Sequence, residues 1–137
     1  MLDEGTAAAE AMILAHSQSK KKDFIVDDKI FPQTLEVLQT RARPLGINIV
    51  KIDLDSSISI SFFSDAFGFI TQLPNSHGNL KHRDGVLRLA ETCKCMKIAI
   101  VDPLCQVLMK PVGEMGFDIA VGSMQRFGVP MGFGGPH

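Results

Sequence analysis

Residues 98 to 101 read Ile-Ala-Ile-Val, and Asp102 follows directly. A continuous apolar run is typical of a strand that is buried on both faces, as in the middle of a parallel sheet. A half-exposed antiparallel strand would alternate apolar with polar residues. The run therefore predicts a parallel sheet with helices on both faces, and it places Asp102 at the carboxyl end of one strand.

The segments on either side of this run alternate between strand and helix patterns. Short apolar runs predict strands at residues 23–26, 47–52, 67–72, 98–101 and 117–121. Apolar residues at helical spacing predict helices after Thr6, from Pro32 to before Pro44, at about residues 82–96, and in a short piece at 104–109. This alternation predicts the α/β class, with parallel strands joined by right-handed crossovers.

Residues 56–64 fit two descriptions. Ile58 and Ile60 alternate with serines, as in an exposed edge strand. The serine density and the neighbouring aspartates suit a loop equally well. The sequence leaves both descriptions open.

The composition excludes several classes of protein. The chain has 137 residues, of which 45% are hydrophobic and 21% charged, and its formal net charge is −1. These values are ordinary for a globular domain and give no electrostatic reason to expect nucleic acid as a partner. No apolar run approaches the length of a bilayer span, so we expect no membrane association. Cys93, Cys95 and Cys105 lack the spacing of a zinc or redox motif, and no metal site is predicted.

The last twenty residues, 118–137, read DIAVGSMQRFGVPMGFGGPH. A strand-like run breaks at Gly122 into a loop in which glycines alternate with large apolar residues. Dense glycine permits positive φ and close approach of the backbone, while apolar residues indicate a loop that packs against something. Because ligands of parallel sheets bind at the carboxyl ends of strands, this loop and Asp102 are predicted to lie at the ligand edge.

The run GSMQRFGVPMGFGGPH resembles the family of the glycine cleavage system P protein, the pyridoxal-phosphate enzyme glycine dehydrogenase (decarboxylating). Four further stretches agree with this family in order and spacing: LDEGTAAAEAM at 2–12, PQT at 32–34, QTRARPLGI at 39–47 and KPVGEMGFDIAVGS at 110–123. The resemblance implies the large domain of the aspartate aminotransferase class. The motifs are similar to the N-terminal half of the family's long form, so we expect a single partial α/β domain over residues 1–137, internal to a longer chain.

Some positions depart from the family pattern. Phe31 stands where the family usually has histidine, Leu73 where it has tyrosine, and Pro103 and Val112 where it has leucine and proline. Several of these positions fall where a site is expected, which indicates a diverged copy.

The resemblance also assigns candidate site residues. Against the family's cofactor-bearing C-terminal half, the Schiff-base position holds Gln125, and an amide cannot form an imine. Asp102 takes the place of the aspartate that pairs with the pyridine nitrogen, although it also suits the cap of a short helix. Gly5 and Thr6 match a phosphate-binding position, although Thr6 equally suits a plain N-cap.

Gly134 and Gly135 complete the pocket-lining candidates, and no catalytic residue is predicted in this chain. We expect Asp102 and Gln125 to face one cleft, as aspartate and lysine do in the active half.

The resemblance implies a function for the whole protein. Its reaction decarboxylates glycine on pyridoxal phosphate and transfers the aminomethyl group to the lipoyl arm of H protein. The segment is expected to be scaffold or interface, with the cofactor held mainly by the C-terminal half of the same protein, in a homodimer of the bacterial cytoplasm or alternatively the mitochondrial matrix. The alternative is a stand-alone, non-enzymatic α/β module or decayed copy without cofactor.

Overall fold

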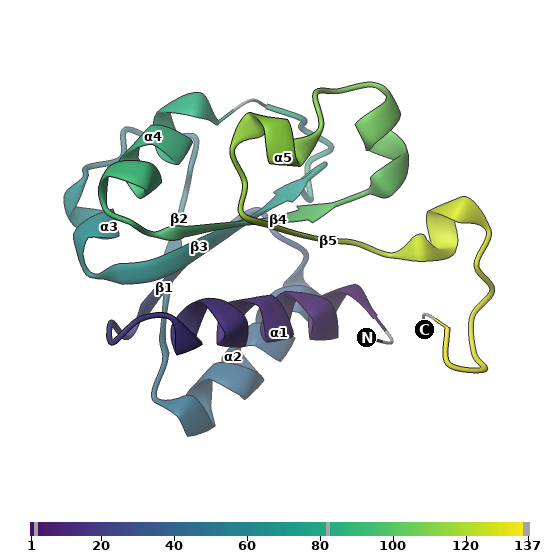
Figure 1. Cartoon of the computed structure of the whole chain (residues 1–137), viewed down its shortest axis with the longest axis horizontal. Helices are drawn as coiled ribbons and strands as arrows, with labels where there is room; N and C mark the ends of the chain where they lie inside the picture. Colours follow the sequence, from purple (N-terminus) through teal and green to yellow (C-terminus); the bar gives the residue numbers. More distant parts are fainter. Residues whose placement is uncertain (2, 82, 136–137) are drawn as a thin grey trace.

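A five-stranded sheet forms the centre of the computed structural model, which describes residues 1, 3–81 and 83–135 (Figure 1). All neighbouring strands run parallel, in the order β2-β1-β3-β4-β5. The strands are β1 (Asp23–Asp27), β2 (Asn48–Ile52), β3 (Ala66–Leu73), β4 (Met96–Val101) and β5 (Ile119–Val121). The parallel α/β fold predicted from the apolar runs is thereby confirmed.

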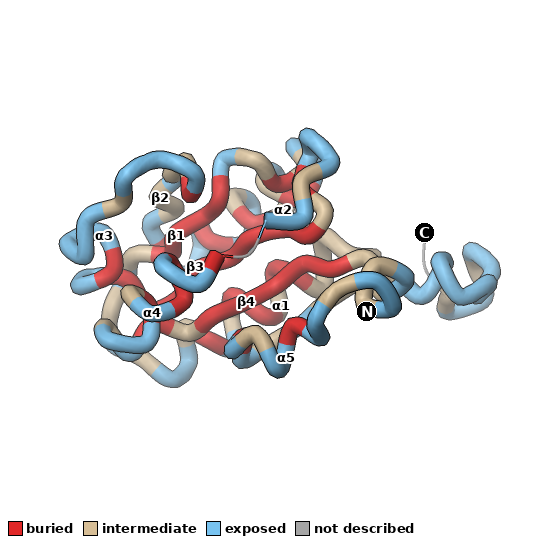
Figure 2. Tube along the Cα trace, turned by 90° about the horizontal axis from the view of Figure 1, so that it is seen from above, coloured by how far each residue is buried: buried red, intermediate tan, exposed pale blue. Residues whose placement is uncertain are grey.

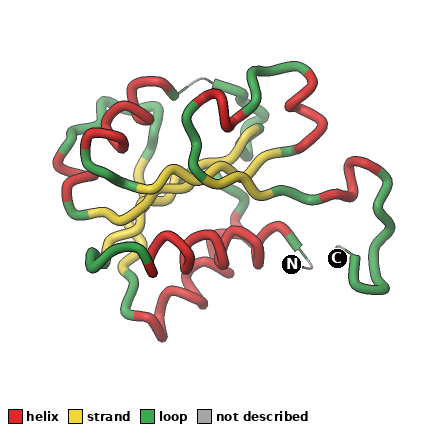
Figure 3. The backbone as a smooth tube through the Cα atoms, viewed as in Figure 1, coloured by secondary structure: helices red, strands yellow, loops and turns green. Residues whose placement is uncertain are grey.

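Helices cover both faces of this sheet (Figures 1 and 3). On one face lie α1 (Glu4–Ser17) and α2 (Pro32–Ala42), with a 3-10 turn, η1 (Arg43–Leu45), after α2. On the other face lie α3 (Ser61–Ser64), α4 (Asp84–Thr92) and α5 (Val112–Met115). Two more 3-10 turns follow strands directly: η2 (Pro103–Val107) after β4 and η3 (Met124–Phe127) shortly after β5.

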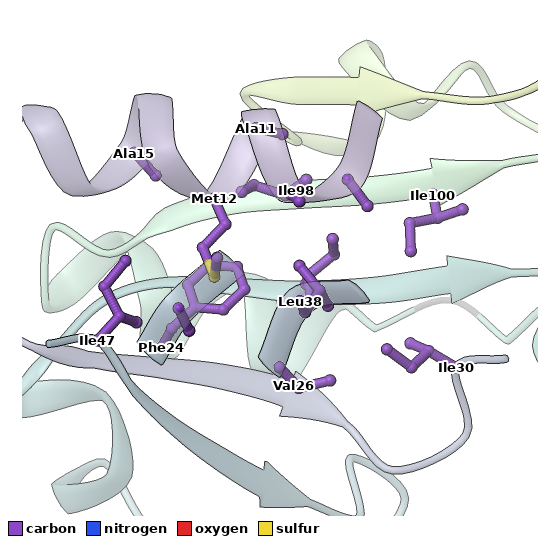
Figure 4. Packing of buried hydrophobic residues seen from close by; sticks show 14 of the residues in the cluster. Ala11, Met12, Ala15, Phe24, Val26, Ile30, Leu38, Ile47, Ile98 and Ile100 are labelled. Carbon is purple, nitrogen blue, oxygen red and sulfur yellow. The ribbon is translucent and has the colours of Figure 1, made fainter. Parts of the chain in front are cut away.

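Apolar side chains fill both interfaces between the sheet and its helices. Every residue of β3 is buried, as expected for the middle strand of a covered parallel sheet. On the α1 and α2 side, Met12 and Leu38 project onto Ile98 and its neighbours (Figure 4). On the opposite side Phe63 meets Phe69 edge to face, with ring centroids 5.7 Å apart. In the view from above, β1 and β4 are red along most of their length (Figure 2).

Residues 56–64 form a loop that ends in α3, and not an edge strand. Local hydrogen bonds of serines hold this conformation: Ser59 Oγ accepts from the backbone of Ser61, and Ser64 Oγ donates to the Ser61 carbonyl. Phe63 is fully buried and anchors the segment. Short polar side chains that bond to nearby backbone compete with strand pairing, and here they prevail.

The helix predicted at residues 82–96 is shorter and spans Asp84–Thr92. Lys94 follows it with a positive φ of 53°, and the Cys95 amide returns to the Ala90 carbonyl at 2.8 Å. This hydrogen bond closes the helix end and turns the chain directly into β4. Residue 82 lies outside the described residues.

The segment after β5 extends away from the sheet as an arm (Figure 1). We call residues 124–135 the C-terminal arm. Phe127, Met131 and Phe133 are largely exposed along it, and it is pale blue over most of its length in Figure 2. Exposed aromatic side chains at this density are typical of a surface that packs against another protein part.

Among the described residues, no helix is long and apolar enough to cross a bilayer. Within the same residues, no three or more histidine, cysteine, aspartate or glutamate side chains gather in a way that could hold a metal ion. Cys93, Cys95 and Cys105 are free thiols. Burial raises the pKa of the Cys95 thiol to about 12, which keeps it protonated and unreactive at neutral pH.

Candidate functional site

A cavity of about 270 Å³ opens at the carboxyl edge of the sheet, where β3, β4 and β5 end beside the start of α1. Its walls combine apolar side chains with carboxylate, amide, hydroxyl and guanidinium groups. The lining residues are Glu4, Phe31, Gln72, Leu73, Pro74, Asp102, Pro103, Ser123 and Arg126. The position agrees with the rule that ligands of parallel α/β sheets bind outside the carboxyl ends of strands.

Asp102 ends β4 and has two structural partners. Its Oδ1 accepts a hydrogen bond from the Leu104 amide at 3.0 Å, so the carboxylate caps η2 as the sequence suggested. Its other partner is Arg126, whose Nε lies 3.0 Å from Oδ2 and 3.2 Å from Oδ1. The Arg126 side chain is 54% exposed, and a pair this exposed contributes less than about 1 kcal/mol. It therefore orients Arg126 at the cavity more than it stabilises the fold.

Gln125 does not line this cavity, and its neighbour Arg126 does. Both belong to η3, and successive side chains of a 3-10 turn point about 120° apart, so the two residues cannot face the same cleft. The structure therefore differs from the expectation that Asp102 and Gln125 face one cleft: Asp102 lines this cavity, Gln125 is exposed and does not line it, and the Arg126 guanidinium contacts Asp102.

The start of α1 lies at the cavity, but it begins earlier than the sequence suggested. Asp3 is the N-cap, and its carboxylate accepts from the Thr6 amide at 2.6 Å. Thr6 is thus a residue of the first turn, and of the two alternatives that the sequence left open for it, the N-cap is wrong by three positions. Gly5 faces α2, since an added Cβ would lie 3.5 Å from the Val37 side chain. That distance is an ordinary van der Waals contact, so the packing of α1 against α2 leaves room for a small side chain at this position.

Glu4 brings a second carboxylate to the cavity beside Asp102. Burial, and after it the negative charge of Asp102, raises the pKa of Glu4 above its ordinary value. Both causes act in the same direction, because each disfavours the ionised carboxylate.

Gly134 and Gly135 line a neighbouring cavity, also about 270 Å³, between the C-terminal arm and the start of α1. Ser123 belongs to both cavities. Gly134 has φ +84°, as its loop position predicts, and a Cβ on Gly135 would lie 2.6 Å from the Pro130 carbonyl oxygen. At these two glycines the C-terminal arm turns back toward the start of α1.

A second polar cluster lies where β1 and β3 end, at the point where the strand order reverses. The fully buried Asp27 accepts from Thr71 Oγ1 at 2.6 Å and from Arg83 Nη2 at 3.1 Å. Arg83 Nη1 donates to Asp55, which also pairs with Lys29. The hydrogen bond from Lys29, followed by the charge of Arg83, lowers the pKa of Asp55 to about 2. These charges neutralise one another and join two loops to the sheet.

Sequence reasoning missed Glu4, Gln72 and Arg126 as cavity residues. One signal was available: Phe31, Leu73 and Pro103, three positions that depart from the family pattern, all line this one cavity. Gln72 fixes part of that wall, because its side-chain oxygen accepts from the Phe31 amide at 2.9 Å. The departures therefore change the shape and polarity of a single site.

Solved structures of other proteins share the fold of this chain. The fold matches cystathionine gamma-lyase from Lactobacillus plantarum with a TM-score of 0.65 at 13% identity, over 85% of this chain and 32% of that one. A match at this identity shows a shared fold. The chain therefore has the same parallel α/β architecture as this lyase.

The family of this chain is shown by a family model and by relatives of higher sequence identity. The glycine cleavage system P-protein family model matches residues 1–137, and the chain belongs to that family. It is 51% identical to a glycine dehydrogenase (decarboxylating) of Synechococcus sp. (strain RCC307) and 48% identical to that of Aliivibrio salmonicida (strain LFI1238). Each match covers the whole chain and 14% of the relative's length.

A crystal structure of glycine decarboxylase (P-protein) in inhibitor-bound form is also similar. It matches the whole chain with a TM-score of 0.87 at 30% identity, over 32% of its own length.

The cavity does not suit the family's cofactor. None of the chain's lysines lines it, so no amine is present for a Schiff base. Asp102 pairs with Arg126 and caps η2, so part of its hydrogen-bonding capacity is already used within the chain. Asp3 fills the amide-rich helix start that would receive a phosphate. The described residues that line this cavity therefore do not form a pyridoxal-phosphate site by themselves.

Proposed function

We propose that this chain is a non-catalytic segment of a glycine decarboxylase, and that it serves as scaffold and interface for a cofactor site carried elsewhere in the same protein. The observation that supports this most directly is the family match over residues 1–137 together with a carboxyl-edge cavity that no lysine reaches. The complete enzyme would decarboxylate glycine on pyridoxal phosphate and pass the aminomethyl group to the lipoyl arm of H protein.

The C-terminal arm supports the interface role. Exposed apolar residues are also present at the end of η2: Val107, its last residue, is 77% exposed, and Leu108, which follows it, is 87% exposed. Apolar surface of this extent is unfavourable in water and is relieved when another protein part covers it. The chain spans 14% of the relatives it matches, so the rest of such a protein, including its cofactor-bearing half, is the partner we assign to this surface.

The family match also supports proposals for the assembly and the cellular compartment of the complete protein. A homodimer is the assembly that we propose for the complete protein, with H protein as its lipoyl-bearing partner. The compartment that we propose is the bacterial cytoplasm, and the mitochondrial matrix is the alternative.

A chimera tests the proposal. Residues 1–137 replace the matching segment of the Synechococcus glycine dehydrogenase (decarboxylating), to which they are 51% identical. We expect the chimera to retain bound pyridoxal phosphate, seen by its visible absorbance, and to keep glycine decarboxylation with H protein within about tenfold of the parent, because a scaffold acts through geometry and contributes no reacting group.

A matched control replaces the same segment with one in which Phe127, Met131 and Phe133 are serine. If the arm forms the interface, this control loses activity while its isolated segment still folds. A chimera that folds and binds cofactor but shows no decarboxylation would contradict the proposal and favour a diverged stand-alone module.

A further inference from the structure

Gln72 brings unpaired hydrogen-bond donors to the carboxyl-edge cavity. Its side chain belongs to the wall of that cavity, although the residue is only 4% exposed. The side-chain oxygen accepts from the Phe31 amide at 2.9 Å, and this contact identifies the other side-chain atom as the nitrogen Nε2. Within the described residues, the two N–H groups of Nε2 have no hydrogen-bond partner. A donor on so buried a side chain is costly to leave unpaired, so the site suits a ligand that brings an acceptor.

Arg126 and Ser123 add further donors to the walls of this cavity. Only Nε of Arg126 contacts Asp102, so Nη1 and Nη2 have no partner in the part of the chain that the structure describes. Ser123 Oγ accepts from the Gln125 amide at 3.3 Å and keeps its own hydroxyl proton as a donor. The forked donors of a guanidinium match the two oxygen atoms of a carboxylate. These donors, together with the amide of Gln72, therefore favour a carboxylate group in the ligand.

Glu4 supplies the opposite kind of group. Its carboxylate lines the cavity and has no hydrogen bond or ion pair within residues 1, 3–81 and 83–135. The other carboxylate of the cavity, Asp102, is already paired with Arg126. An unpaired carboxylate and unpaired guanidinium nitrogen atoms in one cavity fit a ligand that has both an ammonium and a carboxylate group.

The rest of the cavity wall is apolar. It consists of Phe31, Leu73, Pro74 and Pro103, and three of these four depart from the usual pattern of the family. Phe31 and Leu73 stand where the family usually has histidine and tyrosine, so this chain lacks two polar groups at the cavity. A cavity of about 270 Å³ with such a wall can enclose an aliphatic side chain and remove it from water.

We propose that this cavity binds a free α-amino acid with an aliphatic side chain, without forming a covalent bond to it. The carboxylate of the ligand accepts from Arg126 and Gln72, and its ammonium group donates to Glu4. Its side chain contacts the apolar wall. This site goes beyond the proposed function, in which the amino acid is glycine and reacts elsewhere in the complete protein. It depends on the residues of this chain alone, so it holds or fails independently of that function.

Four probes separate the groups of the ligand. L-Leucine has all of them, whereas 4-methylpentanoate lacks the ammonium group, 3-methylbutylamine lacks the carboxylate and glycine lacks the side chain. Binding is followed by chemical-shift changes of the Phe31 and Ser123 amides in the isotope-labelled chain. We expect L-leucine to bind at least about tenfold more tightly than each of the other probes, because each of these lacks one charged hydrogen-bonding group or the apolar side chain.

Two variants assign the ends of the ligand to their residues. Arg126→Met is expected to remove the preference for L-leucine over 3-methylbutylamine, and Glu4→Gln to remove the preference over 4-methylpentanoate. A purely structural effect would weaken L-leucine and its analogue equally and leave both ratios unchanged. Exposed residues outside the cavity provide the matched controls, Arg88→Met on α4 and Glu36→Gln on α2, and neither is expected to change either ratio.

An absence of saturable binding of L-leucine would overturn the inference. Equal affinities of the wild type for L-leucine and any one of the other probes would do the same, and this comparison depends on neither variant. A ratio that stays unchanged in Arg126→Met or in Glu4→Gln would also contradict it, because that residue would then not contact the ligand.

Discussion

Replacing Arg83 with methionine is expected to lower the free energy of unfolding by about 3–5 kcal/mol, because it leaves the carboxylate of Asp27 buried without its cation. The Asp27 side chain is completely buried, and that of Arg83 is 5% exposed. Removing one member of such a pair forces the other to remain charged in a low-dielectric environment or to take up a proton. Urea denaturation followed by circular dichroism measures the change.

Lys81→Met is the matched control for Arg83→Met. Lys81 also pairs with an aspartate, Asp55, but at 3.4 Å and with a side chain that is 60% exposed. An exposed pair contributes less than about 1 kcal/mol, so this variant is expected to change stability little. Equal losses in the two variants would show that the buried cluster is not the element that joins the loops to the sheet.

Gly122→Ala is expected to destabilise the chain by about 3 kcal/mol, through a steric conflict at the end of β5. An added Cβ would lie 2.1 Å from the carbonyl oxygen of Val101 on the neighbouring strand, and this backbone atom cannot move aside as the end of a flexible side chain could. The loop that follows, with Ser123 and Arg126, would be displaced from the cavity. Thermal unfolding measures the first effect, and loss of the Arg126 contact to Asp102 in a crystal structure measures the second.

Gly113→Ala serves as the control for this substitution. Gly113 lies in α5 with no atom within 4 Å of an added Cβ and no positive φ. A glycine-to-alanine change at such a site stabilises slightly, by about 0.4–1 kcal/mol, since it restricts the unfolded chain. A loss at Gly113 as large as that at Gly122 would contradict the explanation by close approach of strands.

The sequence predicts the sheet well because its signals are local. The unbroken apolar run at residues 98–101 forms β4, and each of the other predicted strands is present within a few residues of its expected bounds. Residues 56–64 are the exception, because alternation with serine has the period of a strand while the serine hydroxyl groups bond to their own backbone.

The cavity and the buried polar cluster were harder to predict because residues distant in the sequence create them. In the polar cluster, Asp27 and Arg83 lie 56 residues apart, and no local pattern links them. Glu4 reaches the carboxyl edge only because α1 crosses the sheet, and the choice between Gln125 and Arg126 depends on the turn geometry of η3. Family alignment pointed to Gln125, whereas the backbone places Arg126 at Asp102.

We propose that this segment of a glycine cleavage P protein carries no Schiff-base site of its own, and trapping with borohydride tests this proposal most directly. The chain is incubated with pyridoxal phosphate, reduced, digested and mapped by mass spectrometry. We expect no stoichiometric adduct on any single lysine, with at most scattered, substoichiometric labelling of exposed lysines such as Lys20 and Lys22. One adduct per chain on one specific lysine would contradict the account.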